Sequence, residues 1–173
     1  MHGLLEKLKG GDFRSIGRSE EVAETVLSQP GLFAVLMSGL TADDALVRMR
    51  AADAAEKVTV LHPEWLAPYK RYLLREVARI DQQEVRWHAA IMFTRLKLRK
   101  TERERAVSIL KTWLEDKSRI VQTFSLQALA DLSNRDPRLR SEVKRLIEDK
   151  LTTGPPSVKS RGKKLLKEIS QRG

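Results

Sequence analysis

A spacing of 37 residues recurs along the chain and constrains its fold more than any other feature. It separates Leu36, Leu73, Leu110 and Ile147. Positions four residues before and four residues after these are also apolar or aromatic, so each set marks one stripe of an α-helix. The flanking positions are Leu32, Tyr69, Ala106 and Val143 on one side, and Leu40, Val77, Leu114 and Leu151 on the other. The sequence therefore predicts four helices with one apolar stripe each, which we call the first helices.

A second series of valines follows the first helices at nearly the same spacing. Val47, Val85, Val121 and Val158 are 38, 36 and 37 residues apart. Positions 4, 7, 8 and 11 residues after each valine hold small or apolar residues, which is the pattern of a helix with a buried side. These are the second helices, and their small residues favour close packing between neighbours.

The two series together predict one architecture. A helix pair cannot bury its apolar side alone, whereas a stack of pairs builds a continuous core. We expect an all-α, right-handed α-α superhelix (an α-solenoid) of about four helical-hairpin repeats in a single domain, residues 1–173. The predicted repeats are residues 30–61, 62–98, 99–134 and 135–173, and residues 1–29 form a capping unit in which Ser19 caps a helix. A capping-box pattern at Thr101 and Glu104 predicts the start of the third repeat.

The turns between the paired helices resemble those of the HEAT-repeat family. Asp43 precedes Val47 and Arg48, and Asp81 precedes Val85 and Arg86, with small residues following in both cases. In that family the turn aspartate and the arginine after the valine form a hydrogen-bonded ladder between repeats. The resemblance implies this role for Asp43, Arg48, Asp81 and Arg86. The third repeat departs from the pattern with Gln122, and the fourth with Gly154 and Lys159.

The residue types that catalysis and metal binding need are sparse. The chain has no cysteine, and its three histidines, His2, His62 and His88, do not share a helix face. Neither a phosphate-binding loop nor a nucleophile elbow is present. We expect no enzymatic activity, no cofactor or metal, and no small-molecule substrate. No stretch approaches the ~20 apolar residues of a membrane span, and we expect a cytoplasmic protein.

The excess of positive over negative charge is confined to the C-terminal part of the sequence. Residues 1–96 hold 13 Lys and Arg against 13 Asp and Glu, whereas residues 97–173 hold 20 against 10. The last helix concentrates the excess in Lys159, Arg161, Lys163, Lys164 and Lys167. Such a field attracts anions, including nucleic acid and acidic protein surfaces. The alternative is that these residues form the polar cap with which a solenoid must end, and the two interpretations are compatible.

Trp87 and Ile91 are candidate contact residues for a partner. Helical geometry places them opposite the buried stripe of their helix, on the side where second helices usually line the concave face of a solenoid. An exposed aromatic residue beside an aliphatic one is a common composition for a binding hot spot. The alternatives are that both pack under a neighbouring helix, or that the face assignment is off by one position.

Three classes of function remain open. The leading hypothesis is a non-enzymatic interaction or scaffold module that binds a partner protein through the solenoid face, assisted by the basic C-terminal region. The second is a nucleic-acid-binding protein that contacts phosphates through the C-terminal Lys and Arg residues. A remote third is a DNA alkylation-repair glycosylase, an enzyme class to which the chain is similar only in general architecture.

Overall fold

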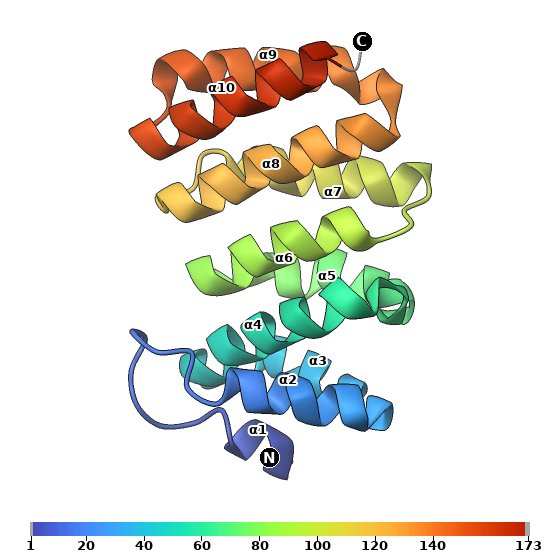
Figure 1. Ribbon diagram of the computed structural model, residues 1–173, viewed down its shortest axis with the longest axis vertical. Helices are drawn as coiled ribbons and strands as arrows, with labels where there is room; N and C mark the ends of the chain where they lie inside the picture. Colours follow the sequence, from blue (N-terminus) through green and yellow to red (C-terminus); the bar gives the residue numbers. More distant parts are fainter. Residues whose placement is uncertain (1, 172–173) are drawn as a thin grey trace. The chain divides into compact units, whose positions relative to one another are not determined.

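The computed structural model describes residues 2–171, and these residues are almost entirely helical (Figure 1). They form ten α-helices and five short 3-10 helices, and they contain no β-strand. The prediction of an all-α chain is confirmed. The structure divides into two compact units, Met1–Leu98 and Arg99–Gly173. We refer to them as unit 1 and unit 2 and describe each by itself.

Unit 1 begins with a four-residue helix, α1 (Gly3–Glu6), followed by a loop and by α2 (Ser19–Ser28). Its two long helices are α4 (Ala45–Leu61) and α6 (Gln83–Arg95), and α4 packs against both α2 and α6. The expected cap at Ser19 is wrong, because Ser19 is already helical and its hydroxyl donates to Asp53 instead.

The predicted first helices of unit 1 are broken into short pieces. Proline is one cause, because it has no N–H to donate and resists the interior of an α-helix. Pro30 and Pro63 begin 3-10 segments, and Pro68 lies inside the second of these. The pieces are η1 (Pro30–Leu32), α3 (Phe33–Ser38) and η2 (Gly39–Thr41), then η3 (Pro63–Tyr69), α5 (Lys70–Arg75) and η4 (Val77–Arg79).

Unit 2 contains longer and more regular helices. They are α7 (Lys100–Trp113), α8 (Arg119–Arg135), η5 (Pro137–Leu139), α9 (Arg140–Thr153) and α10 (Pro156–Gln171). α10 packs against both α8 and α9 (Figure 1). At the start of α7 the Glu102 carboxylate accepts a hydrogen bond from the Arg99 N–H at 2.7 Å, two residues earlier than the capping pair Thr101 and Glu104 that the sequence predicts. Asp136 accepts a hydrogen bond from the Arg138 N–H at the start of η5.

The valines of the second series occupy the same local position in four helices. Val47, Val85, Val121 and Val158 are each the third residue of their helix, and all four are fully buried. The small and apolar residues that follow them are buried as predicted, except for Leu166 and Ile169 of α10, which are half-buried. Among the described residues, no helix is long and apolar enough to cross a membrane.

Candidate functional site

The residue that follows each of the first three valines makes the same backbone contact. Arg48, Arg86 and Gln122 each donate a hydrogen bond to the carbonyl oxygen six residues earlier. The distances are 2.8 Å to Ala42, 3.1 Å to Ile80 and 2.6 Å to Asp116. Gln122, which departs from the resemblance in sequence, therefore preserves this contact. The interaction holds the turn against the first part of the following helix.

Arg48 also connects α4 to the start of α6. Its Nε donates to the side-chain oxygen of Gln82 at 2.8 Å, and the Gln82 amide donates to the Ala45 carbonyl at 2.9 Å. Asp43 contributes its backbone carbonyl to Arg48, and its own side chain is exposed. The partner that links the helices is thus the amide of Gln82 and not the turn aspartate that the resemblance implies.

The second turn aspartate makes a different contact from the first. Asp81 forms an ion pair with Arg86 at 3.1 Å, and both residues belong to the same predicted repeat. The four residues of the implied ladder therefore lie close to the turns of unit 1. The two aspartates, however, use different groups, one a carbonyl and the other a carboxylate.

Trp87 and Ile91 are half-buried, whereas the sequence predicted that they face outward. The Trp87 ring stacks on the His88 ring, with 3.4 Å between their centroids. Met49 and Ala130, which lie on the corresponding faces of α4 and α8, are buried. Packing therefore covers part of the second-helix face on which Trp87 and Ile91 lie.

The five basic candidates of the last helix separate into two groups. Lys163, Lys164 and Lys167 are exposed and form no ion pair with any residue that the structure describes; we call them the basic face of α10. Lys159 and Arg161 are half-buried. Arg161 donates to the side-chain oxygen of Gln127 at 2.8 Å and so ties α10 to α8.

Several other basic residues of unit 2 are compensated by carboxylates. The pairs are Arg103–Asp136 at 2.8 Å, Lys111–Glu142 at 2.6 Å, Lys150–Glu115 at 2.6 Å and Lys144–Glu148 at 3.9 Å. Hydrogen bonding by Arg138 lowers the pKa of Asp136 to about 2, with a smaller contribution from Arg103. The basic face of α10 is distinguished from these residues by its lack of acidic partners.

A cluster of polar side chains lies between α2, α4 and α6 in unit 1. The Asp53 carboxylate accepts hydrogen bonds from Ser19 at 2.5 Å and from Lys57 at 2.7 Å. It also lies 3.9 Å from Nε2 of His88. Beside it, Arg95 forms an ion pair with Glu56. The cluster joins three helices that the sequence does not place together by spacing alone.

His88 is the most perturbed group of this cluster. Its side chain is almost completely buried, and burial lowers its pKa to about 3 even though Asp53 favours the protonated form. Its Nδ1 atom is buried and has no hydrogen-bond partner among the residues that the structure describes. The imidazole is therefore neutral at physiological pH. A buried neutral ring packed between helices acts as a structural element of unit 1.

Arg50 is a second buried polar residue, and sequence reasoning did not identify it. Its guanidinium donates to the backbone carbonyls of the loop that joins α1 to α2. The distances are 2.7 Å to Leu8, 2.6 Å to Gly10, 3.2 Å to Asp12 and 3.2 Å to Ser15. Gly11 and Gly17 adopt positive φ angles and pass close to the guanidinium, where a Cβ atom would touch it. Arg50 therefore fixes the conformation of this loop.

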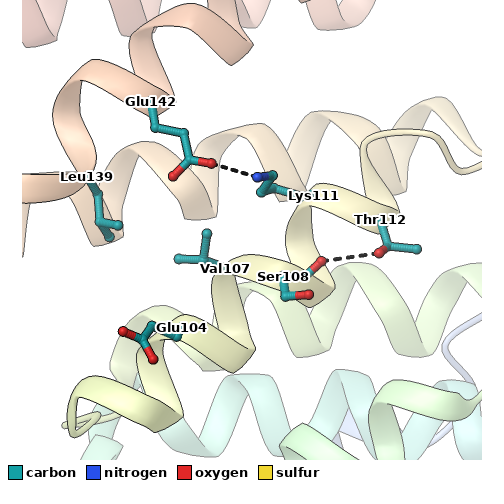
Figure 2. Close-up of a pocket in the computed structure, with 7 residues that line it drawn as sticks. All are labelled: Glu104, Val107, Ser108, Lys111, Thr112, Leu139 and Glu142. Atoms are coloured by element: carbon teal, nitrogen blue, oxygen red, sulfur yellow. Dashed lines mark hydrogen bonds and ion pairs between the residues drawn. The ribbon is translucent and has the colours of Figure 1, made fainter.

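A shallow groove of about 410 Å³ lies between α7 and the start of α9 (Figure 2). Val107 and Leu139 supply its apolar surface, and Glu104, Glu142 and Lys111 stand around it. The Lys111–Glu142 ion pair joins the two helices on one side of the groove. Ser108 and Thr112 of α7 complete the lining. We call this feature the α7–α9 groove.

Comparison with known proteins relates the chain to others by fold only. No family model and no curated protein matches the sequence. One similar solved structure is the crystal structure of an engineered protein from the Northeast Structural Genomics Consortium. The two share 19% sequence identity at a TM-score of 0.62, over 98% of this chain and 79% of the engineered one. At this level of identity the similarity concerns the fold alone.

Proposed function

We propose that the chain is a HEAT-like α-solenoid of four helix pairs, with α2 as the helix of an N-terminal cap. Two regularities support this proposal. Four valines spaced about 37 residues apart are the third residues of four helices, and three of the residues that follow them bind the carbonyl six positions earlier. Independent helices would have no reason to repeat both features.

We further propose that the solenoid is a non-enzymatic module that binds a partner protein, and that the basic face of α10 draws in an acidic surface of that partner. The observation that carries this proposal is that three exposed lysines, Lys163, Lys164 and Lys167, lie within five residues of one helix and form no ion pair with the described residues, whereas Arg103, Lys111 and Lys150 of the same unit have carboxylate partners. Unpaired exposed charges raise the local potential and speed the association of complementary surfaces. Trp87 and Ile91 supply partial apolar contacts on the second-helix face.

Nucleic acid is the second candidate partner, since the same lysines would attract phosphates. Two features make a protein the better fit. The basic face offers three lysines, and Glu168 lies in the same turn as Lys167, so few phosphates would be neutralised. No aromatic residue lies on α10 to stack on bases.

Affinity capture with a charge-reversed variant tests the proposal. The immobilised full chain would be compared with Lys163→Glu/Lys164→Glu/Lys167→Glu in lysate of the source cells, with and without nuclease. The matched control is Lys100→Glu/Lys117→Glu/Arg119→Glu, which makes the same change in net charge at exposed positions elsewhere in unit 2. We expect a partner that the wild type and the control retain, that the α10 variant loses, and that resists nuclease.

Two other outcomes would contradict the proposal. If the α10 variant retained the same partner, the basic face of α10 would not be the binding site for that partner. A nuclease-sensitive partner would assign the chain to nucleic-acid binding instead. In that case affinity for the purified nucleic acid should fall steeply with salt, roughly 40-fold between 50 and 200 mM for about three phosphate contacts.

A further inference from the structure

The α7–α9 groove combines an apolar floor with a carboxylate at its edge, in a unit whose net charge is positive. Its floor is apolar, with Val107 buried and Leu139 half-buried. Its edge carries Glu104, an exposed carboxylate that forms no ion pair with the described residues. Glu104 contributes only weakly to the raised pKa of Arg138, whose main cause is the hydrogen bond between Arg138 and Asp136. Glu104 is therefore available to a ligand.

The second carboxylate of the groove is placed differently. Glu142 is held by Lys111 at 2.6 Å, and this pair stands on the side away from Glu104 (Figure 2). Ser108 lies on the α7 wall between Glu104 and Lys111 and adds a hydroxyl oxygen. The groove thus presents hydrogen-bond acceptors on α7 and on α9, with an aliphatic surface between them.

One side chain matches this arrangement in both shape and charge. Arginine has an aliphatic stem that packs on apolar surface and a planar cationic head with five N–H donors. Its fork matches a carboxylate such as Glu104 in two parallel hydrogen bonds, which a lysine ammonium cannot form. The volume of about 410 Å³ is ample for one such side chain.

We propose that the α7–α9 groove binds an arginine side chain of a partner peptide, with the stem over Val107 and Leu139 and the guanidinium on Glu104. This inference rests on the proposed function, in that it assigns a second contact to an interaction module. It uses none of the residues of the basic face of α10. A partner that bound both the α7–α9 groove and the basic face of α10 would carry an arginine for the groove and acidic groups for the basic face.

Methyl NMR on the full chain tests the inference without a known partner. The probe is acetyl-Gly-Arg-Gly-amide, and its neutral control replaces arginine by citrulline, which has nearly the same shape. We expect the methyl resonances of Val107 and Leu139 to shift on titration with the arginine peptide, with an affinity in the millimolar range that suits so small a ligand. The citrulline peptide should bind about tenfold more weakly, because the charge-assisted hydrogen bonds are lost.

Variants locate the effect and separate it from binding at α10. Glu104→Gln should weaken arginine binding about tenfold, whereas Glu148→Gln, an exposed position of α9 outside the groove, should leave it unchanged. The triple α10 variant should bind the peptide as the wild type does. The inference would be overturned by unshifted Val107 and Leu139 methyls, by equal binding of the citrulline peptide, or by full affinity in Glu104→Gln. None of these results depends on whether a partner protein is captured through α10.

Discussion

Unit 1 and unit 2 build their cores from helices with the same spacing of apolar residues, but they differ in how the first helices are formed. In unit 1 these segments alternate between 3-10 and α-helical turns, whereas α7 and α9 of unit 2 are continuous over 14 residues each. Pro30, Pro63 and Pro68 account for part of the difference. The comparison shows that burial of an apolar stripe does not require a regular α-helix, because Leu36 and Leu73 are as fully buried as Leu110.

The polar contacts between second helices differ even more. Asp53 and Gln127 each follow their valine by six residues, and His88 and Arg161 follow theirs by three. In unit 1 this pair of positions holds a carboxylate 3.9 Å from a buried, neutral imidazole. In unit 2 it holds an amide that accepts a hydrogen bond from a guanidinium at 2.8 Å. At these positions unit 1 therefore holds a buried imidazole, whereas unit 2 joins its helices through two half-buried polar side chains.

The largest expected effect is the loss of stability on replacing Arg50, which we compare with the replacement of Arg161. The two arginines occupy equivalent positions, three residues after Val47 and Val158. Arg50→Ala removes the donor to four backbone carbonyls and should lower the free energy of unfolding by about 3 kcal/mol. Arg161→Ala removes one hydrogen bond to Gln127 and should cost about 1 kcal/mol. Urea denaturation of both variants measures the difference. Equal losses would show that the buried Arg50 stabilises the chain no more than the half-buried Arg161 does.

A smaller effect is expected from adding one methyl group to a glycine in each unit. A Cβ atom at Gly39 would lie 2.7 Å from the Cβ of Ala51, which cannot move without displacing α4. Gly39→Ala should therefore destabilise the chain by about 2 kcal/mol.

Gly162 of α10 is the glycine that we compare with it in unit 2. An added Cβ would lie 3.1 Å from the end of the Leu151 side chain, which can shift. The gain in helix propensity, about 1 kcal/mol, should offset this contact and leave Gly162→Ala near the stability of the wild type. Thermal unfolding monitored by circular dichroism compares the two variants. A large loss at Gly162 would mean that α10 is packed as rigidly as the interior of unit 1.

The third prediction concerns the free energy of unfolding in acid solution. It tests whether the buried imidazole of His88 in unit 1 makes the protein sensitive to acid. An unfolded histidine takes up a proton near pH 6.5, whereas folded His88 does so only near pH 3. The unfolded state therefore binds more protons as the pH falls below 6.5, and stability should fall by up to about 1.4 kcal/mol per pH unit. His88→Gln removes the titrating group and should flatten this dependence between pH 6.5 and 5.

The control for this prediction is His62→Gln, at a half-buried position at the start of η3. It leaves His88 in place and should retain the loss of stability that His88 causes below pH 6.5. The window ends at pH 5 because Glu21 and Asp136, whose pKa values are lowered to about 2 by ion pairing, lose their stabilising contribution only in more acid solution. Identical pH profiles for the wild type and His88→Gln would show that His88 is not the source of acid sensitivity.

Regular spacing explains what could be predicted from the sequence. The positions of Val47, Val85, Val121 and Val158 indicated four helices and their buried sides, because a repeated pattern with helical periodicity depends only on local geometry. The excess of positive charge in residues 97–173 could also be counted directly.

Contacts over long sequence distances explain what could not be predicted. Arg50 looks like a surface residue, and only the return of the loop before α2 makes it buried. Gln82 becomes the partner of Arg48 because α4 and α6 lie side by side. The α7–α9 groove depends on the separation of two helices, to which no spacing in the sequence corresponds.

Hydrogen–deuterium exchange of the full chain, alone and with its captured partner, tests the central claim most directly. If the basic face of α10 makes the contact, backbone amides of residues 156–171 should exchange at least several-fold more slowly in the complex. Lys163→Glu/Lys164→Glu/Lys167→Glu should abolish this protection. Unchanged exchange in α10, with protection confined to helices of unit 1, would contradict the assignment of binding to unit 2.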